Sequence, residues 1–447
     1  MDSDRVWRGG GGRALPDDPL RWLRLPRTVI RPLRARSLLE RYRSDVEQLV
    51  HRYRVEGRSS KALRARLEIL RPRVRRYLLT GNGQRGSLLE ALALVREIAG
   101  RSLQQRPYEV QLVAALAMID GHVVQLAPGE GKTLTIAVTA IIQAWRGLPC
   151  HIMTANSYLA ARDAEQMAAL YAFCGLGCTA LDDNPDRSLR RDAYAQAIVY
   201  GTAQQFLADF LRDRLALGTS PDRLRLTMVQ AFGAPPDVVM RGLGCAIVDE
   251  ADSTLVDEAN TPLIISGPRP DPSLAQAVLC AHRLVGGLTE GSDFRIDRVH
   301  RDVRFSNACW RRLLAQRGAM PAEWRNEARF EHILNQAALA RGFYRLDEHY
   351  IIEDDKVVII DERTGRPMPA RSWSHGLHQA VECQAGVPLS DPTETVERMS
   401  FQNFLRLYEH LSGASGTLQG LDRELGLVYD KVVVRVPTRK RDRRCIH

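Results

Sequence analysis

Hydrophobic residues follow two different spacings along this chain. Short, continuous apolar runs predict buried strands, and longer stretches with apolar residues three and four positions apart predict amphipathic helices. Because the two kinds of segment take turns, the pattern predicts an α/β fold with a parallel, doubly wound sheet. The expected strands cover residues 122–126, 150–154, 198–202 and 245–248, and the expected helices cover 28–54, 59–79, 87–99, 134–145, 157–173 and a stretch ending at 214.

The alternation is interrupted after residue 267. Pro268, Pro270 and Pro272 break the pattern, and helical spacing resumes at 274–285 and 327–340. Two apolar runs at 350–352 and 357–360 then flank a polar turn, which predicts a β-hairpin. We expect a smaller α+β domain inserted here. Its strands could support a bound peptide by strand addition or could be ordinary sheet structure.

The strand at 122–126 leads into a glycine-bearing turn and a helix. The turn reads Gly129-Glu130-Gly131-Lys132-Thr133. Glycine lets the backbone curl so that several N–H groups face one anion, and the new helix adds free N–H groups. In such a phosphate-binding loop the lysine reaches the β- and γ-phosphates, and the hydroxyl of the next residue holds Mg²⁺. The alternative is an ordinary glycine turn before a helix.

Lysine usage favours the phosphate-binding interpretation. The chain contains five lysines and 58 arginines, yet position 132 has lysine. A phosphate loop needs a compact ammonium, for which the guanidinium fork is a poor substitute. The strict pattern places glycine at position 126, where this chain has Leu126. That relaxed form is typical of helicase-like motors.

A second apolar run, 245–248, delivers Asp249-Glu250-Ala251-Asp252 at its end. In open α/β sheets, ligands bind at the carboxyl ends of the strands. We expect Asp249 to hold Mg²⁺ through water and Glu250 to polarise the water that attacks the γ-phosphate. An acidic strand end can also be a simple turn signal, but its occurrence together with the phosphate loop favours a nucleotide hydrolase.

A short segment before the phosphate loop could contact a nucleotide base. It contains Tyr108, whose ring could stack on the base, and Gln111, whose amide could read both adenine edges. Glutamine is common, so the position just ahead of the loop carries the inference. We expect Tyr108 and Gln111 to belong to an ATP site.

Composition fits a globular protein of several domains. The 447 residues allow two or three domains. No apolar run reaches the ~18–20 residues of a membrane span, and the first residues lack the apolar stretch of a signal peptide. The eight cysteines are scattered and indicate neither a zinc site nor a disulfide framework. Cys445 and His447 could ligate a metal, although a fortuitous tail is the simpler interpretation.

Positive charge is concentrated near the N-terminus. Residues 1–106 carry 25 basic and 11 acidic side chains, a net charge of +14, whereas the whole chain has +10. A basic arm suits an anionic partner such as a lipid surface, a nucleic acid or an acidic protein. A solvated helical face in an arginine-rich chain explains the same count, so both interpretations stay open.

Several stretches of the chain form a recognisable set of motifs. They are residues 129–133, 158–165, 200–202, 257–268 (Asp-Glu-Ala-Asn-Thr-Pro-Leu-Ile-Ile-Ser-Gly-Pro), 361–366, 373–382 (Trp-Ser-His-Gly-Leu-His-Gln-Ala-Val-Glu), 401–408 and 412–417. With these motifs the chain, from about residue 30 onward, resembles the SecA preprotein translocase ATPases, the motors of bacterial protein export. Generic helicases share the phosphate loop and the acid pair but lack the Thr-Pro-Leu-Ile-Ile-Ser-Gly-Pro and Gly-Leu-His-Gln-Ala-Val-Glu runs.

The resemblance implies a fold and a domain map. The implied fold is a RecA-like parallel sheet of the P-loop, DEAD type with helices on both faces, preceded by a helical region and interrupted by a smaller domain. The implied segments are a flexible basic N-terminus (1–27), an N-terminal helical region (28–89), a first motor domain (90–268 and 367–438), a preprotein cross-linking-like insertion (269–366) and a basic tail (439–447).

Two positions depart from the family pattern. Asn260 stands where the family usually has arginine, and residues 415–418 read Ser-Gly-Thr-Leu where it usually has Thr-Gly-Thr-Ala. The chain also stops near the point where the family's second motor domain would begin. That domain would supply an arginine finger, so the resemblance implies slow ATP hydrolysis by this chain alone.

The implied function is that of the ATP- and Mg²⁺-binding half of a motor for protein export. The implied partners are secretory preproteins, a SecYEG-type translocon, anionic inner-membrane lipid and a separately encoded second motor half; nucleic acid is not expected. The implied location is cytoplasmic and peripheral on the inner membrane. Two alternatives remain: a DEAD-type nucleic-acid helicase, and a non-catalytic module that binds preprotein or translocon.

Overall fold

The computed structural model describes residues 27–440 except 82, 184–185, 218–237, 269, 362–364, 369–370 and 374–375. The segment expected to be a flexible N-terminus and most of the basic tail therefore lie outside the described residues. The chain divides into two compact units. One contains the residues up to 263 and from 398 onward, and the other contains residues 264–397.

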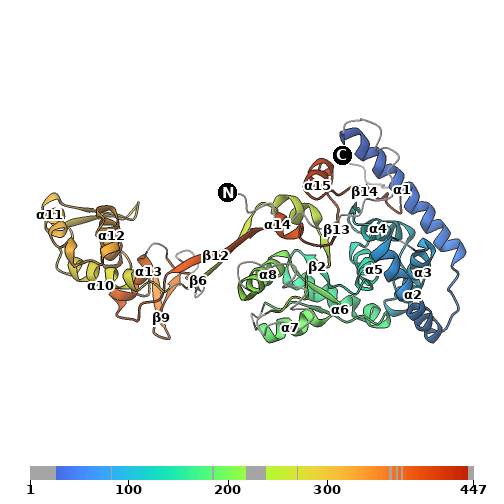
Figure 1. Ribbon diagram of the computed structural model, residues 1–447, viewed down its shortest axis with the longest axis horizontal. Coiled ribbons are helices and arrows are strands. Elements are labelled where there is room, and N and C mark those ends of the chain that lie inside the picture. Colours follow the sequence, from blue (N-terminus) through green and yellow to red (C-terminus); the bar gives the residue numbers. More distant parts are fainter. Residues whose placement is uncertain are drawn as a thin grey trace. The chain divides into compact units, whose positions relative to one another are not determined.

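Three helices open the first unit: α1 (Arg27–Arg52), α2 (Ser60–Thr80) and α3 (Arg85–Ser102). The Ser59 hydroxyl accepts a hydrogen bond from the N–H of Ala62 and caps α2, and Gly81 ends the helix in a left-handed conformation with φ of 66°. Helix α1 packs along α4 (Glu109–Ile119) and β14 (Val433–Arg435), as Figure 1 shows. The predicted helices at 28–54 and 59–79 are confirmed.

A seven-stranded sheet forms the centre of the first unit, with strand order β14-β1-β13-β5-β2-β4-β3. All neighbouring pairs are parallel. The predicted parallel sheet is therefore confirmed. The remaining strands are β1 (Val123–Gln125), β2 (Cys150–Thr154), β3 (Cys178–Ala180), β4 (Ile198–Thr202), β5 (Cys245–Asp249) and β13 (His410–Ser415).

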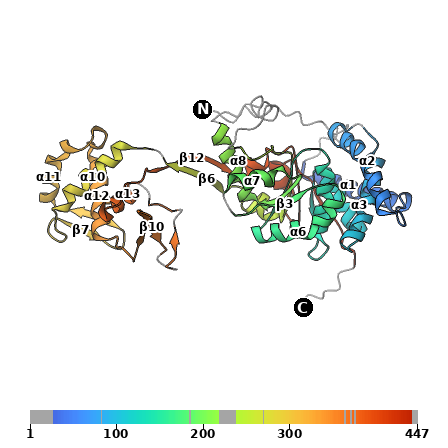
Figure 2. The same ribbon diagram turned by 90° about the horizontal axis from the view of Figure 1, so that it is seen from below.

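Helices connect these strands and share their hydrophobic core. Buried side chains of α1 to α6 and of the central strands form one cluster. Helix α6 packs against β3 and β4 at one edge of the sheet (Figure 2). The helices that follow α4 are α5 (Lys132–Ala144), α6 (Ser157–Phe173), α7 (Arg187–Ala195), α8 (Ala203–Leu217), the π-helical turn η2 (Ser253–Asp257), α14 (Phe401–Leu405) and α15 (Asp422–Val428).

The second unit combines helices with short antiparallel sheets around its own core. The predicted hairpin is confirmed, since β9 and β10 pair antiparallel and β11 adds to β10. The elements are α10 (Pro272–Gly286), β7 (Phe294–Asp297), β8 (Asp302–Phe305), α11 (Asn307–Ala315), η3 (Arg317–Ala319), η4 (Ala322–Trp324), α12 (Glu327–Gly342), β9 (Tyr350–Glu353), β10 (Lys356–Ile360), β11 (Pro367–Met368) and α13 (Leu377–Ala385). The strands that leave and rejoin the first unit, β6 (Pro262–Pro268) and β12 (Thr393–Ser400), pair with each other.

The second unit extends further than the sequence suggested. The insertion was expected to end at residue 366, with 367–438 returning to the motor domain, but the compact unit runs to residue 397. Helix α13 explains the difference, because it packs against α10 and α12. Its residues Ala380 and Val381 lie in the same buried cluster as Phe330 and Ile333 of α12. The packing of α13, rather than the sequence motifs around it, sets the boundary of the second unit.

Candidate functional site

The phosphate loop lies between the end of β1 and the start of α5. Gly129 and Gly131 have φ of 85° and 79°, left-handed values that disfavour other residues. A Cβ atom at Gly131 would also collide with the side-chain amide nitrogen of Gln111. Both glycines are therefore required by the local backbone. Helix α5 starts directly at Lys132, so the lysine and Thr133 sit in its first turn.

Gln111 connects the segment before α4 to this loop. Its Nε2 donates to the carbonyl oxygen of Glu130 at 2.8 Å and lies 3.4 Å from that of Gly131, and its Oε1 accepts the backbone N–H of Tyr108 at 2.7 Å. The side chain is buried. In this structure the amide that was expected to read adenine holds the phosphate loop.

The acid pair meets the phosphate loop because the strands are in register. Gln125 of β1 lies opposite Ser415 of β13, and the neighbouring Ala414 lies opposite Asp249 of β5. The carboxyl ends of the three strands therefore share one edge of the sheet. There, the Lys132 ammonium forms an ion pair with Glu250 and lies 3.9 Å from Asp249 Oδ1.

Burial changes the acidity of Asp249. Only 18% of its side chain is exposed. Desolvation of the carboxylate raises the pKa of Asp249 from 3.8 to about 6, against the opposing attraction of Lys132. The backbone of Glu250 next to it has φ of 56°, a left-handed value that is uncommon for a non-glycine residue. Such departures often accompany functional sites.

Asp252, the last acid of the Asp-Glu-Ala-Asp motif, contacts the turn after β13. The Thr417 hydroxyl donates to Asp252, and the backbone N–H of Thr417 donates to Ser415 Oγ at 3.1 Å. Burial alone would raise the pKa of Asp252, but these hydroxyl contacts hold it below its ordinary value. Residues 415–418, where the chain departs from the family pattern, are thus linked to the acid strand.

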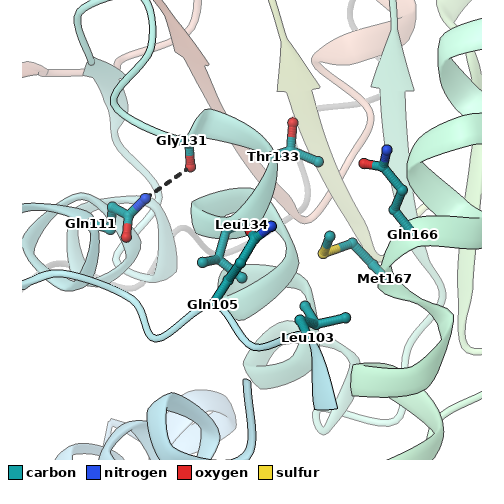
Figure 3. A pocket seen from close by; sticks show the side chains of 8 residues that line it. All are labelled: Leu103, Gln105, Gln111, Gly131, Thr133, Leu134, Gln166 and Met167. Carbon is teal, nitrogen blue, oxygen red and sulfur yellow. Dashed lines mark hydrogen bonds between the residues drawn. The ribbon is translucent and has the colours of Figure 1, made fainter. Parts of the chain in front are cut away.

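A cavity of about 440 Å³ opens beside the phosphate loop (Figure 3). Apolar side chains alternate around it with glutamine amides. A flat, polar-edged ring suits such a lining. The lining residues are Leu103, Gln105, Gln111, Gly131, Thr133, Leu134, Gln166 and Met167.

Two of the predicted site residues, Tyr108 and Glu130, contact Arg439 and do not line the cavity. Tyr108 is not among the residues that line the cavity, and the guanidinium carbon of Arg439 lies 3.5 Å above its ring. The Glu130 side chain accepts a hydrogen bond from the backbone N–H of Arg439. The structure therefore brings Gln111, Lys132, Asp249 and Glu250 around one edge of the sheet and places Tyr108 at its border.

Sequence reasoning missed most of the cavity wall. Leu103 and Gln105 come from the irregular segment between α3 and α4, and Gln166 and Met167 come from α6. Residues 158–165 form one of the motifs on which the resemblance to SecA rests, and the cavity residues Gln166 and Met167 follow them immediately. The spacing along that helix could have indicated them, but their direction depends on how α6 packs.

The donor set suits a magnesium ion held together with a nucleotide. Thr133 offers a hydroxyl, and Asp249 and Glu250 offer carboxylates, which are the hard oxygen ligands that Mg²⁺ prefers. Within the described residues, three or more His, Cys, Asp or Glu side chains nowhere gather as a metal cluster.

The parallel sheet, the loop from β1 to α5 and the acids at the end of β5 define a DEAD-like P-loop domain. The chain belongs to the SecA DEAD-like domain family, because the model of that family matches residues 29–426. None of the helices in the described part of the chain is long and apolar enough to cross a membrane.

Curated relatives support this family assignment. The chain is 39% identical to protein translocase subunit SecA 2 of Magnetococcus marinus over 396 residues, which cover 88% of this chain and 61% of the relative. It is 39% identical to SecA 2 of Chlorobium chlorochromatii, covering 86% and 58%, and 37% identical to SecA of Myxococcus xanthus, covering 82% and 37%. The chain thus spans about 60% or less of these relatives' length.

Proposed function

We propose that this chain binds Mg²⁺-ATP and is the N-terminal motor half of a SecA-like translocation ATPase. The observation that carries the proposal is the contact of Lys132 with Glu250 and its proximity to Asp249, at the edge where the phosphate loop begins α5. When a nucleotide binds, the Lys132 ammonium would move from these two carboxylates to the phosphate oxygens. The base would enter the cavity beside Gln111, and residues 129–133 would surround the phosphates.

The acids have separate proposed roles in hydrolysis. Asp249 would hold Mg²⁺ through water, with the Thr133 hydroxyl as the second protein group. The metal would offset the charge on the phosphates. Glu250 would orient and deprotonate the attacking water once Lys132 has left it. Turnover by this chain alone should be slow if a second motor half supplies an arginine finger.

The proposed partners follow from the family. Relatives are named translocase subunits, so we propose that this chain acts in protein export with secretory preproteins and a SecYEG-type translocon, at the cytoplasmic face of the inner membrane. The family match favours this function over a nucleic-acid helicase, which rested on the Asp-Glu-Ala-Asp word and the basic arm. The second unit is the proposed preprotein-binding part.

The test is ATP binding and hydrolysis by the whole chain with two substitutions. Lys132→Ala should weaken ATP binding at least tenfold, because it removes the cation nearest the acids and the loop. Glu250→Gln should keep binding and reduce turnover by about 100-fold or more, as expected for loss of a general base. Calorimetric titration with Mg²⁺-ATP and a phosphate-release assay measure the two effects.

Lys356→Ala provides the control, since this exposed lysine lies in the β9–β10 hairpin of the second unit. It removes the same charge and should leave ATP affinity unchanged. Equal affinities for the parent and Lys132→Ala would contradict the proposed site. Binding without any turnover in the parent would favour the non-catalytic module, and turnover stimulated by RNA or DNA would revive the helicase alternative.

A further inference from the structure

The segment after β14 runs beside the phosphate loop. The backbone N–H of Val436 donates to the carbonyl oxygen of Gln125 at 3.1 Å and fixes the start of this segment next to the end of β1. Three residues further, the backbone N–H of Arg439 lies 3.3 and 3.4 Å from the two carboxylate oxygens of Glu130. The chain is therefore anchored at both sides of the loop.

Four contacts close a ring around the loop. The Arg439 guanidinium stacks on Tyr108, with 3.5 Å between its carbon and the ring centre. The Tyr108 N–H donates to Gln111, the Gln111 amide donates to the Glu130 carbonyl, and the Glu130 carboxylate accepts from the Arg439 N–H. Each residue of the ring touches the next, so displacement of one disturbs the others.

Glu130 is the group that this ring controls. It is the only acid between residues 126 and 133, and a carboxylate in a phosphate-binding loop repels the ligand. The hydrogen bond from Arg439 draws this carboxylate toward the segment 436–440. Tyr108 does not line the cavity, so a base there would not have to displace Arg439.

We propose that Arg439 is a positioning residue of the nucleotide site. By stacking on Tyr108 it keeps the segment 436–440 against the phosphate loop and holds the Glu130 carboxylate away from the incoming phosphates. The ring pre-organises the loop, which reduces the ordering that ligand binding would otherwise require. This inference rests on the proposed ATP site.

Binding of Mg²⁺ and the slowly hydrolysed analogue ATPγS to the whole chain tests the proposal. Removing an exposed cation–π contact should weaken binding about two- to fivefold, so Arg439→Ala should raise Kd by that factor. Arg439→Lys keeps a cation over the ring and should recover most of the affinity. Lys440→Ala removes the same charge from the next residue and should bind like the parent.

Two further measurements separate positioning from a general loss of structure. In the nucleotide-free protein, amides of residues 126–133 should exchange hydrogen faster in Arg439→Ala, while the unfolding temperature changes little. Tyr108→Leu should weaken binding as Arg439→Ala does, and the double variant should be no weaker than either. If the losses of affinity in the two single variants add up in the double variant, Arg439 does not act through its stacking contact with Tyr108.

The proposal is wrong if Arg439→Ala binds ATPγS as tightly as the parent, or more tightly, or if Lys440→Ala loses the same affinity. These failures differ from failure of the ATP site itself. If Lys132→Ala binds ATPγS as the parent does, the proposed ATP site is wrong, and so is the positioning role of Arg439. If only Lys132→Ala loses binding, the site stands and the positioning role alone is overturned.

Discussion

Asp249 shows how the site changes the chemistry of a single residue. Its carboxylate lies at the end of a buried strand, and desolvation raises its pKa to about 6 although Lys132 lies 3.9 Å away. The folded-state pKa is above the unfolded value of 3.8, so the folded protein holds this proton more tightly. Ionisation of Asp249 therefore costs stability as pH rises through about 6, with a full effect of about 3 kcal/mol.

Asp249→Asn should accordingly stabilise the fold at neutral pH. The amide resembles the protonated acid, so the gain should reach about 1–3 kcal/mol at pH 7.5 and shrink toward zero at pH 4. Urea unfolding at both pH values measures it. Asp422→Asn removes an exposed carboxylate that pairs with Arg435 and should give no such gain. Equal effects of Asp249→Asn at both pH values would contradict the argument.

Single residues were also where the sequence was most informative. Lys132 stood out because lysine is rare in this chain, and Asp249 and Glu250 because they follow an apolar run. The sequence could not show that the Gln111 amide turns toward the carbonyls of Glu130 and Gly131, since those contacts depend on how α4 sits beside the loop. Tyr108 was assigned a stacking role, and its ring stacks on Arg439.

Among the elements, the long helices were predictable and the short ones were not. The spacing of apolar residues predicted a helix over 87–99, but α3 begins at Arg85. Arg85 instead contacts Asp45 at 2.8 Å and the Tyr77 hydroxyl at 2.9 Å, so tertiary contacts extend the helix. The three-residue strands β3 and β14 were missed, whereas β1, which is equally short, was predicted because a glycine-bearing turn and a helix follow its apolar run.

The π-helical turn η2 is an element that no sequence pattern indicated. It directly follows the Asp-Glu-Ala-Asp motif of residues 249–252, and the Glu258 N–H donates to the Ser253 carbonyl at 2.9 Å. Such turns are uncommon and often lie at functional sites. The buried Tyr429 hydroxyl donates to the Leu255 carbonyl at 3.0 Å and holds the turn in place.

Tyr429→Phe should therefore destabilise the first unit by about 1–2 kcal/mol, because it leaves a buried carbonyl without this donor. The amides of 253–258 should also exchange hydrogen faster. Tyr158→Phe removes a hydroxyl from a residue that is 74% exposed and should change stability by less than about 0.5 kcal/mol. If both variants unfold at the same urea concentration as the parent, the hydroxyl does not stabilise η2.

The whole molecule consists of two units with separate cores, and the first carries the charge asymmetry. Residues 1–106 have a net charge of +14. Within the described part of this stretch, Arg43 of α1 and Arg73, Arg75 and Arg76 of α2 are exposed. Exposed cations attract an anionic lipid surface over about one Debye length. This supports the proposed membrane-surface partner.

The chain should therefore sediment with vesicles that contain phosphatidylglycerol and remain in solution with purely zwitterionic vesicles. Binding should fall steeply when salt is raised to 0.5 M, because screening shortens the range of the attraction. Replacing Arg73, Arg75 and Arg76 together by serine should weaken it, whereas replacing the exposed Arg304, Arg311 and Arg329 of the second unit should have less effect. Sedimentation that is indifferent to lipid charge would exclude this partner.

The sequence by itself determined the fold class and the chemical groups of the site. Local spacing encodes a helix or a strand, and residue type encodes the loop, the lysine and the acids. Tertiary structure decided the rest: β13 inserts between β1 and β5, α13 joins the second unit, and Arg439 reaches Tyr108. These features join residues more than a hundred positions apart or depend on which core a helix enters. Only the packing of the folded chain sets them, since no local pattern records a distant partner.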